Sequence, residues 1–140
     1  MLNKKDKNLV SAVLMHGNRL ARKSEIKPRH TVVAGVQSKS GNLYFGVNCD
    51  GIHGSCAEIV AYANAVIYED GNVDTIVSAS IDAKGKSRIL MPCGNCRQIF
   101  FEISKNISFI IEENGKLKKK SITKMLPFPY VHNQPVNKKK

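Results

Sequence analysis

Hydrophobic residues recur at helical spacing near the start of the chain and alternate with a strand-like period soon afterwards. Leu9 and Val13 lie on one face of a predicted helix over residues 6–23. Two β-branched and aromatic runs, at 31–36 and 43–47, are separated by a Ser-Gly-Asn turn. This combination predicts a β-hairpin directly after the first helix.

The second half of the chain alternates helical and extended patterns. An Ala-rich stretch without Gly or Pro predicts a helix over 56–68, and a second helix is predicted over 93–103. Strands are expected at 73–81 and 107–111, with a polar loop at 84–87. The order of elements is typical of an α/β fold, with a mixed central sheet covered by helices.

The C-terminal part of the chain is less regular. Residues 116–120 are either a charged edge strand or a loop, and residues 122–126 can form one helical turn. Three prolines then predict an extended tail. Because no repeat or linker is visible, we expect one domain over 1–134, followed by a basic tail at 135–140.

Length and composition agree with a single globular domain. The chain has 140 residues, of which 42% are hydrophobic and 24% charged, so disorder and low-complexity repeats fit poorly. No apolar run approaches the roughly 18 residues that a membrane-spanning helix needs. No secretory apolar stretch follows the basic N-terminus. We therefore expect a cytoplasmic protein, without a membrane partner, whose four cysteines are reduced.

The positive charge of the chain is concentrated at its two ends. The net charge is +11, and residues 1–30 and 116–140 hold eight Lys or Arg each, whereas 31–115 holds nine acids against six bases. Basic ends can bind phosphates. However, no aromatic residues interleave with the lysines as a stacking platform would require. The pattern therefore favours a solvated surface, and nucleic acid is not the expected partner.

The candidate chemistry lies in two short cysteine motifs. Cys56 precedes Glu58 by two residues at the start of one predicted helix, and Cys93 and Cys96 follow Pro92 at the start of the other. Helix N-termini stabilise thiolates, and three thiolates suit a tetrahedral Zn²⁺ with one position open for water. Glu58 is placed to take a proton from that water. Zinc nucleobase deaminases carry this same joint spacing.

Each part of this pattern also has an ordinary explanation. Ser55 and Glu58 have the spacing of a capping box, and buried free cysteines are common packing residues. Cys49 could complete a closed, non-catalytic site of four thiolates. The joint pattern favours the open catalytic site, because every ordinary explanation would have to hold at once.

The chain resembles the cytidine deaminase family over about residues 31–131, and within it the blasticidin-S branch. The segments that carry the resemblance are Gly46-Val47-Asn48, Cys56-Ala57-Glu58, Pro92-Cys93-Gly94-Asn95-Cys96-Arg97-Gln98 and Leu126-Pro127-Phe128-Pro129-Tyr130-Val131. The resemblance implies a three-layer fold, a zinc cofactor and assembly into homotetramers in which neighbouring subunits complete each pocket.

The resemblance also implies roles for individual residues. The implied zinc ligands are Cys56, Cys93 and Cys96. The residues implied in substrate binding are Asn48, Asp50, Ala57 and Tyr130. Glu58 would transfer a proton to the cytosine ring and then to the leaving ammonia. The chain departs from the family pattern at Asp50, where relatives carry Glu, and at Ile59, where many carry Arg.

Three functions are therefore under consideration. The favoured hypothesis is a zinc-dependent hydrolytic deaminase of a free cytosine nucleoside or nucleoside antibiotic, namely cytidine, deoxycytidine or blasticidin S. The alternatives are a cytosine deaminase that acts on nucleic acid and a structural zinc-binding module without catalysis. The sequence alone does not choose among the three free substrates.

Overall fold

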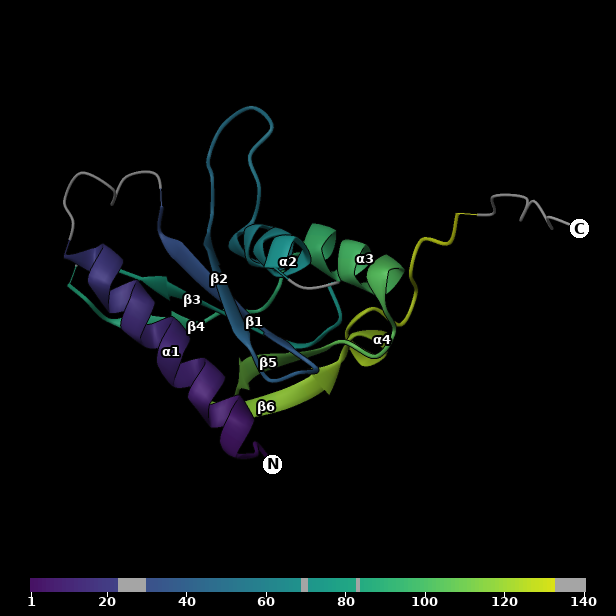
Figure 1. Cartoon of the computed structure of the whole chain (residues 1–140), viewed down its shortest axis with the longest axis horizontal. Coiled ribbons are helices and arrows are strands. Elements are labelled where there is room, and N and C mark those ends of the chain that lie inside the picture. The colour runs from purple at the N-terminus through teal and green to yellow at the C-terminus, as the bar shows by residue number, and fades with distance from the viewer. Residues whose placement is uncertain (23–29, 69–70, 83, 133–140) are drawn as a thin grey trace, which may run out of the picture.

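A mixed β-sheet forms the middle layer of the molecule (Figure 1). The computed structural model describes residues 1–22, 30–68, 71–82 and 84–132. Its strands are β1 (Val32–Ser38), β2 (Leu43–Val47), β3 (Val73–Ile81), β4 (Ser87–Ile89), β5 (Ser108–Glu113) and β6 (Lys116–Ser121). Its helices are α1 (Lys4–Ala21), α2 (Ala57–Tyr68), α3 (Gly94–Ile103) and α4 (Ile122–Met125).

Strand β3 lies at the centre of the sheet. The strand order is β2-β1-β3-β5-β6, and β1 pairs antiparallel along the length of β3. The opposite edge of β3 is shared: its first half pairs parallel with β5, and its second half pairs antiparallel with β4. The sheet is thus mixed, as the sequence predicts.

Helices cover both faces of the sheet and produce three layers. Helix α1 packs on one face through Leu9 and Val13, which share a buried cluster with Val33, Val77 and other strand residues. Helices α2 and α3 cover the other face, where Ala61 of α2 and Phe100 of α3 belong to one buried cluster. Figure 1 shows α1 on one side of the strands and α2 and α3 side by side on the other.

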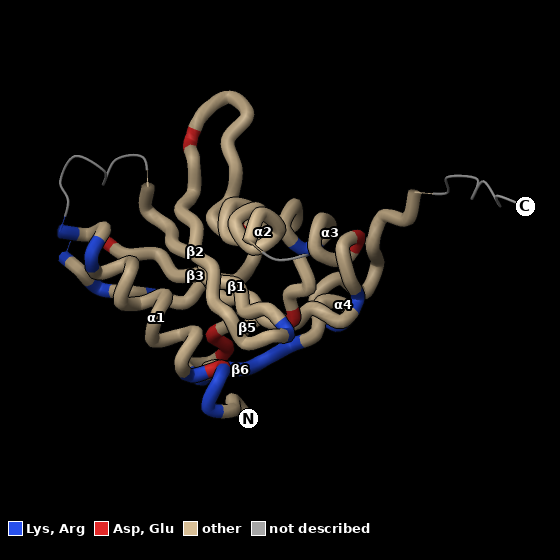
Figure 2. The backbone as a smooth tube through the Cα atoms, in the orientation of Figure 1, with Lys and Arg blue, Asp and Glu red and all other residues tan. Residues whose placement is uncertain are grey.

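Helix α1 begins earlier than its hydrophobic pattern predicts. Asn3 caps it, because the Asn3 side chain accepts a hydrogen bond from the Asp6 N–H and the Asp6 carboxylate accepts one from the Asn3 N–H. The predicted end at residue 23 lies outside the described residues. The carboxylate of Asp6 is buried and also contacts Nζ of Lys119 at 2.7 Å. This ion pair joins the two basic ends of the chain, and Figure 2 shows the start of α1 beside β6.

The edges of the sheet differ from the sequence prediction in detail. The polar loop predicted at 84–87 runs into a short strand, β4, that the sequence pattern does not reveal. The alternative left open for 116–120 is decided in favour of a charged edge strand, β6, and α4 is the predicted single turn. The predicted basic tail at 135–140 lies outside the described residues.

Among the described helices, none combines the length and the apolar composition that crossing a membrane requires.

Candidate active site

Three thiols meet where the N-terminal ends of α2 and α3 lie together. Cys56 directly precedes α2, Cys93 is the N-cap residue of α3, and Cys96 lies buried in the first turn of α3. Their Sγ atoms all lie within 4.8 Å of one another. Further along, the two helices pack against each other through an edge-to-face contact between the rings of Tyr62 and Phe100.

The geometry and chemistry of this group fit a zinc ion. Tetrahedral zinc with Zn–S bonds of about 2.3 Å requires sulfur atoms about 3.8 Å apart. The Sγ atoms of Cys56 and Cys93 lie 3.6 Å apart. Thiolate sulfur is a soft donor that selects zinc over magnesium or calcium. Cys56, Cys93 and Cys96 could therefore hold Zn²⁺ with one position left over.

The surroundings of the three thiols affect their pKa values differently. Burial raises the pKa of Cys96, and the nearby Glu58 carboxylate raises it further. Burial likewise raises the pKa of Cys56. For Cys93, the opposing effect of burial is outweighed by hydrogen bonds from the Cys96 N–H and its neighbours, which hold the pKa of this thiol below its usual value. Of the three thiols, Cys93 is therefore the one whose surroundings favour the thiolate form.

Glu58 lies in the first turn of α2 and is buried, with 5% of its surface exposed. Glu58 does not form the capping box with Ser55 that the sequence allows. Oε1 of Glu58 accepts a hydrogen bond of 3.0 Å from the Ser78 hydroxyl on β3, and the Ser55 hydroxyl donates instead to the carbonyl of Cys56. The carboxylate therefore faces inward, beside the thiols.

Glu58 and two of the thiols form part of the wall of a cavity of about 670 Å³. Its lining residues are Val32, Asn48, Cys49, Asp50, Gly51, Ile52, Gly54, Ser55, Cys56, Ala57, Glu58, Leu90, Met91 and Cys93. These lining residues include two carboxylates and no Lys, Arg or His. The described wall of the cavity therefore favours neutral or cationic molecules over anionic ones.

Asn48 and Asp50 form a small hydrogen-bonded unit on this wall. The Asn48 side chain accepts from the Val32 N–H at 2.9 Å and donates to Oδ1 of Asp50 at 2.8 Å. Nδ1 of His30 donates to the Asn48 carbonyl at 2.6 Å. The unit joins β1 to the end of β2, so two of the predicted substrate-binding residues are held together beside the thiols.

Cys49 does not join the group of three thiols. It begins a loop that Cys49 and Ser55 close with two backbone hydrogen bonds, at 3.0 and 2.9 Å. The loop projects beyond α2 in Figure 1. In the part of the chain that the structure describes, the cysteine group suited to a metal comprises Cys56, Cys93 and Cys96. Cys49 faces the cavity as a separate thiol.

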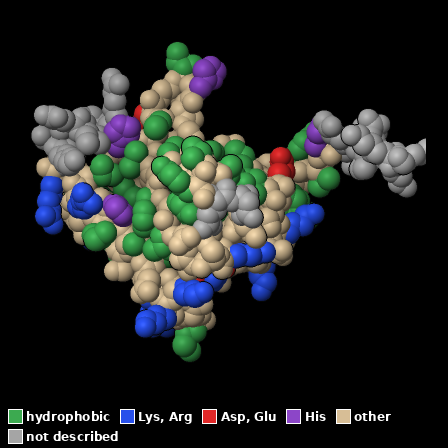
Figure 3. Space-filling view, viewed as in Figure 1, with side chains coloured by type: hydrophobic (Ala, Val, Ile, Leu, Met, Phe, Trp, Pro, Cys, Tyr) green, Lys and Arg blue, Asp and Glu red, His purple; other side chains and the backbone are tan. Residues whose placement is uncertain are grey.

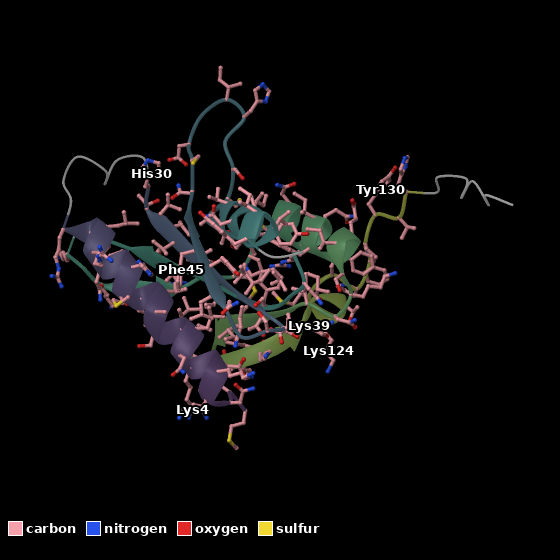
Figure 4. The ribbon with its side chains drawn as sticks, viewed as in Figure 1. Lys4, His30, Lys39, Phe45, Lys124 and Tyr130 are labelled. Atoms are coloured by element: carbon pink, nitrogen blue, oxygen red, sulfur yellow. The ribbon has the colours of Figure 1, made fainter. Side chains whose placement is uncertain are left out.

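Tyr130 lies outside this cavity within a single chain. It is 67% exposed, and its backbone N–H and carbonyl both bond to the side-chain amide of Gln98, at 3.0 and 2.8 Å. Figure 4 shows Tyr130 beyond α3, on the opposite side of the view from His30. Ala57, in contrast, is fully buried at the start of α2 and lines the cavity.

Arg97 does not direct its guanidinium at the thiols. Its Nε donates to the carbonyl of Pro92 at 2.9 Å, and its Nη1 donates to the carbonyl of Met125 at 3.5 Å. Arg97 thus ties the segment before α3 to α4. The helix N-termini remain as the nearby source of positive potential for the thiolates.

Sequence reasoning did not identify two residues of the site. Ser78 lies in a strand whose neighbouring positions are buried. The signal available in the sequence was a hydroxyl residue within an otherwise apolar strand. His30 was interpreted from the sequence as a surface residue, whereas the structure places it half-buried and bonded to the Asn48 carbonyl. Both act through contacts with residues 20 and 18 positions away, respectively, which local patterns do not reveal.

Comparison with known proteins identifies the family. The chain is 31% identical over 112 residues to the blasticidin-S deaminase of Bacillus cereus, a match that covers 75% of this chain and 80% of that protein. The chain belongs to the cytidine deaminase family. A search against protein-family models finds no match.

Solved cytidine deaminases share the fold. The cytidine deaminase from Bacillus anthracis superposes with a TM-score of 0.74 at 18% identity, covering 91% of this chain and 90% of that one. The enzyme from Mycobacterium leprae gives a TM-score of 0.64 at 21% identity, covering 86% and 96%. The mixed six-stranded sheet and its helices are thus those of cytidine deaminase structures.

Proposed function

We propose that this protein is a zinc-dependent hydrolase that replaces the amino group of a free cytosine nucleoside, or of a nucleoside antibiotic such as blasticidin S, with oxygen from water, and releases ammonia. The observation that carries the proposal is the buried Glu58 carboxylate on a cavity wall beside three converging thiols. A structural zinc site has no need of such a carboxylate.

The residues of the chain divide the chemistry between them. Zinc held by Cys56, Cys93 and Cys96 would supply a Lewis acid that makes water nucleophilic at neutral pH. Glu58 accepts a proton from the attacking water and delivers it to the ring nitrogen beside the reacting carbon. Glu58 then carries the proton of the newly added hydroxyl to the amino group, which can leave only once it is protonated, so that the C–N bond breaks, ammonia departs and the carbonyl of the uracil ring forms.

Asn48 and Asp50 would hold the sugar or the equivalent part of an antibiotic. The Asn48 amide is oriented by its bonds to Val32 and Asp50, so it offers a fixed surface to a ligand. Ala57, buried beneath the cavity at the first position of α2, would offer its backbone to the base. The pair Asn48 and Asp50 therefore supports recognition of a polar group attached to cytosine.

The charge of the cavity favours a free nucleoside over a nucleic acid. A strand or a nucleotide would bring phosphates to a wall that carries Asp50 and Glu58 and, among its described residues, no basic side chain. The lysines gather instead on β6 and the start of α1, as Figure 2 shows. We expect cytidine or deoxycytidine to be turned over at least tenfold more efficiently than the corresponding monophosphate.

The active form would be a homotetramer. Hydrophobic side chains gather over α2 on the face shown in Figure 3. At the end of α2, Ile67 and Tyr68 are each 75% exposed, and Tyr68 stacks on Tyr44 of β2. Such an exposed apolar surface is typical of a protein contact. Assembly would also let Tyr130, which lies outside its own cavity, reach substrate in a neighbouring subunit.

The decisive experiment combines a substrate panel with variants of Glu58. Purified, zinc-loaded protein is given cytidine, deoxycytidine, their monophosphates, blasticidin S and a cytosine oligonucleotide, and loss of the amino group is followed by ultraviolet absorbance. Glu58→Gln should lower kcat by about 10²–10⁴-fold, the usual contribution of a general acid–base group. Zinc content should stay at the parent's level. The matched control is Glu112→Gln, an exposed carboxylate on β5.

The proposal fails if no cytosine compound loses its amino group, or if Glu58→Gln is as active as the parent. Activity confined to the oligonucleotide would instead support the nucleic-acid alternative. Full zinc content without any turnover would support the structural module.

A further inference from the structure

Ser78 makes a buried hydrogen bond to the carboxylate at the centre of the site. Its hydroxyl donates to Oε1 of Glu58 at 3.0 Å, and the two residues are only 3% and 5% exposed. In the described residues, Ser78 is the hydrogen-bond partner that the structure gives Glu58. A hydrogen bond between a hydroxyl and a charged carboxylate is stronger in such a buried position than at the surface.

The position of the Ser78 hydroxyl is fixed by the centre of the sheet. Ser78 pairs with Ala34 of β1, and its carbonyl accepts a hydrogen bond of 2.9 Å from the N–H of Leu90. Leu90 itself lines the cavity. The Ser78 hydroxyl is therefore attached to a backbone that is hydrogen-bonded at both edges of β3. The Glu58 carboxylate, in contrast, lies at the end of a side chain with three rotatable bonds.

The hydrogen bond lies on the face of the sheet that carries the buried cluster formed with α2 and α3. Ala34, Ala57 and Ala61 are fully buried in the cluster on the same face of the sheet. The side chains of these three residues carry no hydrogen-bond donor that could replace the hydroxyl. If Ser78 lost its hydroxyl, Oε1 of Glu58 would lose its donor in a place where a carboxylate is costly to leave unpaired.

We propose that Ser78 is a positioning residue for Glu58. By holding Oε1 against β3, it fixes the carboxylate in the orientation in which the group borders the cavity, so that proton transfer does not wait for the side chain to find that orientation. This inference rests on the proposed deaminase function and extends it to a residue that is neither among the three thiols nor among the residues lining the cavity. It predicts an effect on the chemical step and not on substrate binding.

The kinetic test compares three variants in the zinc-loaded protein. Ser78→Ala should lower kcat by about ten- to hundredfold, with KM within about twofold of the parent, as loss of a positioning partner does. Ser78→Thr, which keeps the hydroxyl, should recover most of the lost kcat. Ser80→Ala is the matched control, since it removes a hydroxyl from the same strand at a residue that borders a different depression.

Several kinetic results would overturn the inference. An unchanged kcat in Ser78→Ala, a change confined to KM, or equal losses in the Ala and Thr variants would each show that the hydroxyl does not position Glu58. Equal loss in Ser80→Ala would show a general effect on β3. Zinc content is measured for every variant, and a loss of zinc in Ser78→Ala would assign its effect to the metal site instead.

A structural readout separates this inference from the proposed function. Crystal structures of the parent and of Ser78→Ala, both with zinc, should show Glu58 in one conformation in the parent, and displaced or in several conformations in the variant. An unchanged Glu58 in the variant would overturn the inference whether or not the protein is a deaminase. If the parent is inactive on every cytosine compound but Glu58 moves in the variant, the proposed function fails and the positioning role stands.

Discussion

At the scale of single residues, the cysteines are distinguished by their burial and their neighbours. Cys96 is fully buried beside two other thiols, whereas Cys49 is exposed and lies on a separate loop. We predict that Cys49→Ala retains one zinc per chain and that Cys96→Ala loses at least most of it. Zinc is quantified by mass spectrometry after dialysis against a weak chelator.

The same measurement tests whether the site is open. If Cys49→Ala released its zinc as readily as Cys96→Ala, a closed site of four thiolates would replace the open one, and the vacant position that catalysis needs would not exist. Circular dichroism of both variants guards against unfolding as the cause of the loss.

Residue identity was predictable where chemistry demands a spacing. Cys56, Cys93 and Cys96 could be assigned to one site because three soft donors and a nearby acid rarely coincide in sequence. Ser78 could not be assigned, because its partner lies 20 positions away and its placement depends on how α2 packs on β3. Tyr130 was expected at the pocket, yet a single chain holds it outside, through Gln98.

At the scale of elements, one glycine sets the distance between α2 and β2. A Cβ atom built on Gly46 would lie 2.3 Å from the backbone N of Ala61 and 2.8 Å from the carbonyl oxygen of Ala57. Since both contacts are with backbone, neither can move aside by a rotamer change. We predict that Gly46→Ala destabilises the protein by about 1–3 kcal/mol or more, as overpacking does.

The control for this prediction is Gly51→Ala. A Cβ on Gly51 would meet nothing within 4 Å, so this variant should stay within about 1 kcal/mol of the parent. Urea denaturation at one protein concentration measures both. Equal stability of Gly46→Ala and the parent would show that α2 can shift away from β2 at no cost.

The edge strand β6 supplies a prediction about pH. Hydrogen bonds from Lys118 and Lys120 lower the pKa of Glu113 to about 2, from an ordinary value of 4.5. A carboxyl whose pKa is lower in the folded state contributes stability above pH 4.5 and loses that contribution as the pH falls towards 2. The parent should therefore have a higher Tm than Glu113→Gln at pH 7, with a gap that narrows between pH 4.5 and 2.

The size of this effect is limited by solvent, because the ion pairs are exposed. Added salt should narrow the gap at pH 7. The variant Glu112→Gln, altered at the adjacent exposed carboxylate of β5, should show a gap that depends less on pH. A Tm gap for Glu113→Gln that widened on acidification would have the wrong sign for this account.

Most elements were predictable from local pattern, and the differences have local or distant causes. The start of α1 was predicted too late, because the cap Asn3 and the first helical residues, Lys4 and Lys5, are polar and lie ahead of the hydrophobic period. Strand β4 was missed, because its three residues form a strand only by pairing with the free half of β3. The charged sequence of β6 allowed either strand or loop until its pairing with β5 decided it.

At the scale of the whole molecule, the three layers place the ends of α2 and α3 together and so create the site. The alternation of helices and strands predicts such layers, but the order of strands in the sheet could not be read from the sequence, since long-range pairing decides it. The two basic ends of the chain also meet only in the folded molecule, where Asp6 contacts Lys119. Function thus depends on arrangements that local patterns predict only in part.

The exposed apolar end of α2 gives the last prediction. If it forms a contact between subunits of the proposed tetramer, Ile67→Lys should place a charge in that contact and produce smaller species, as measured by light scattering coupled to gel filtration. Because Tyr130 is proposed to act in a neighbouring cavity, deaminase activity per chain should fall in parallel. Met15→Lys is the matched control, since Met15 is 53% exposed on α1 and should leave both properties unchanged. A parent that elutes as a monomer with full activity would contradict the assembly and require Tyr130 to act, if at all, within its own chain.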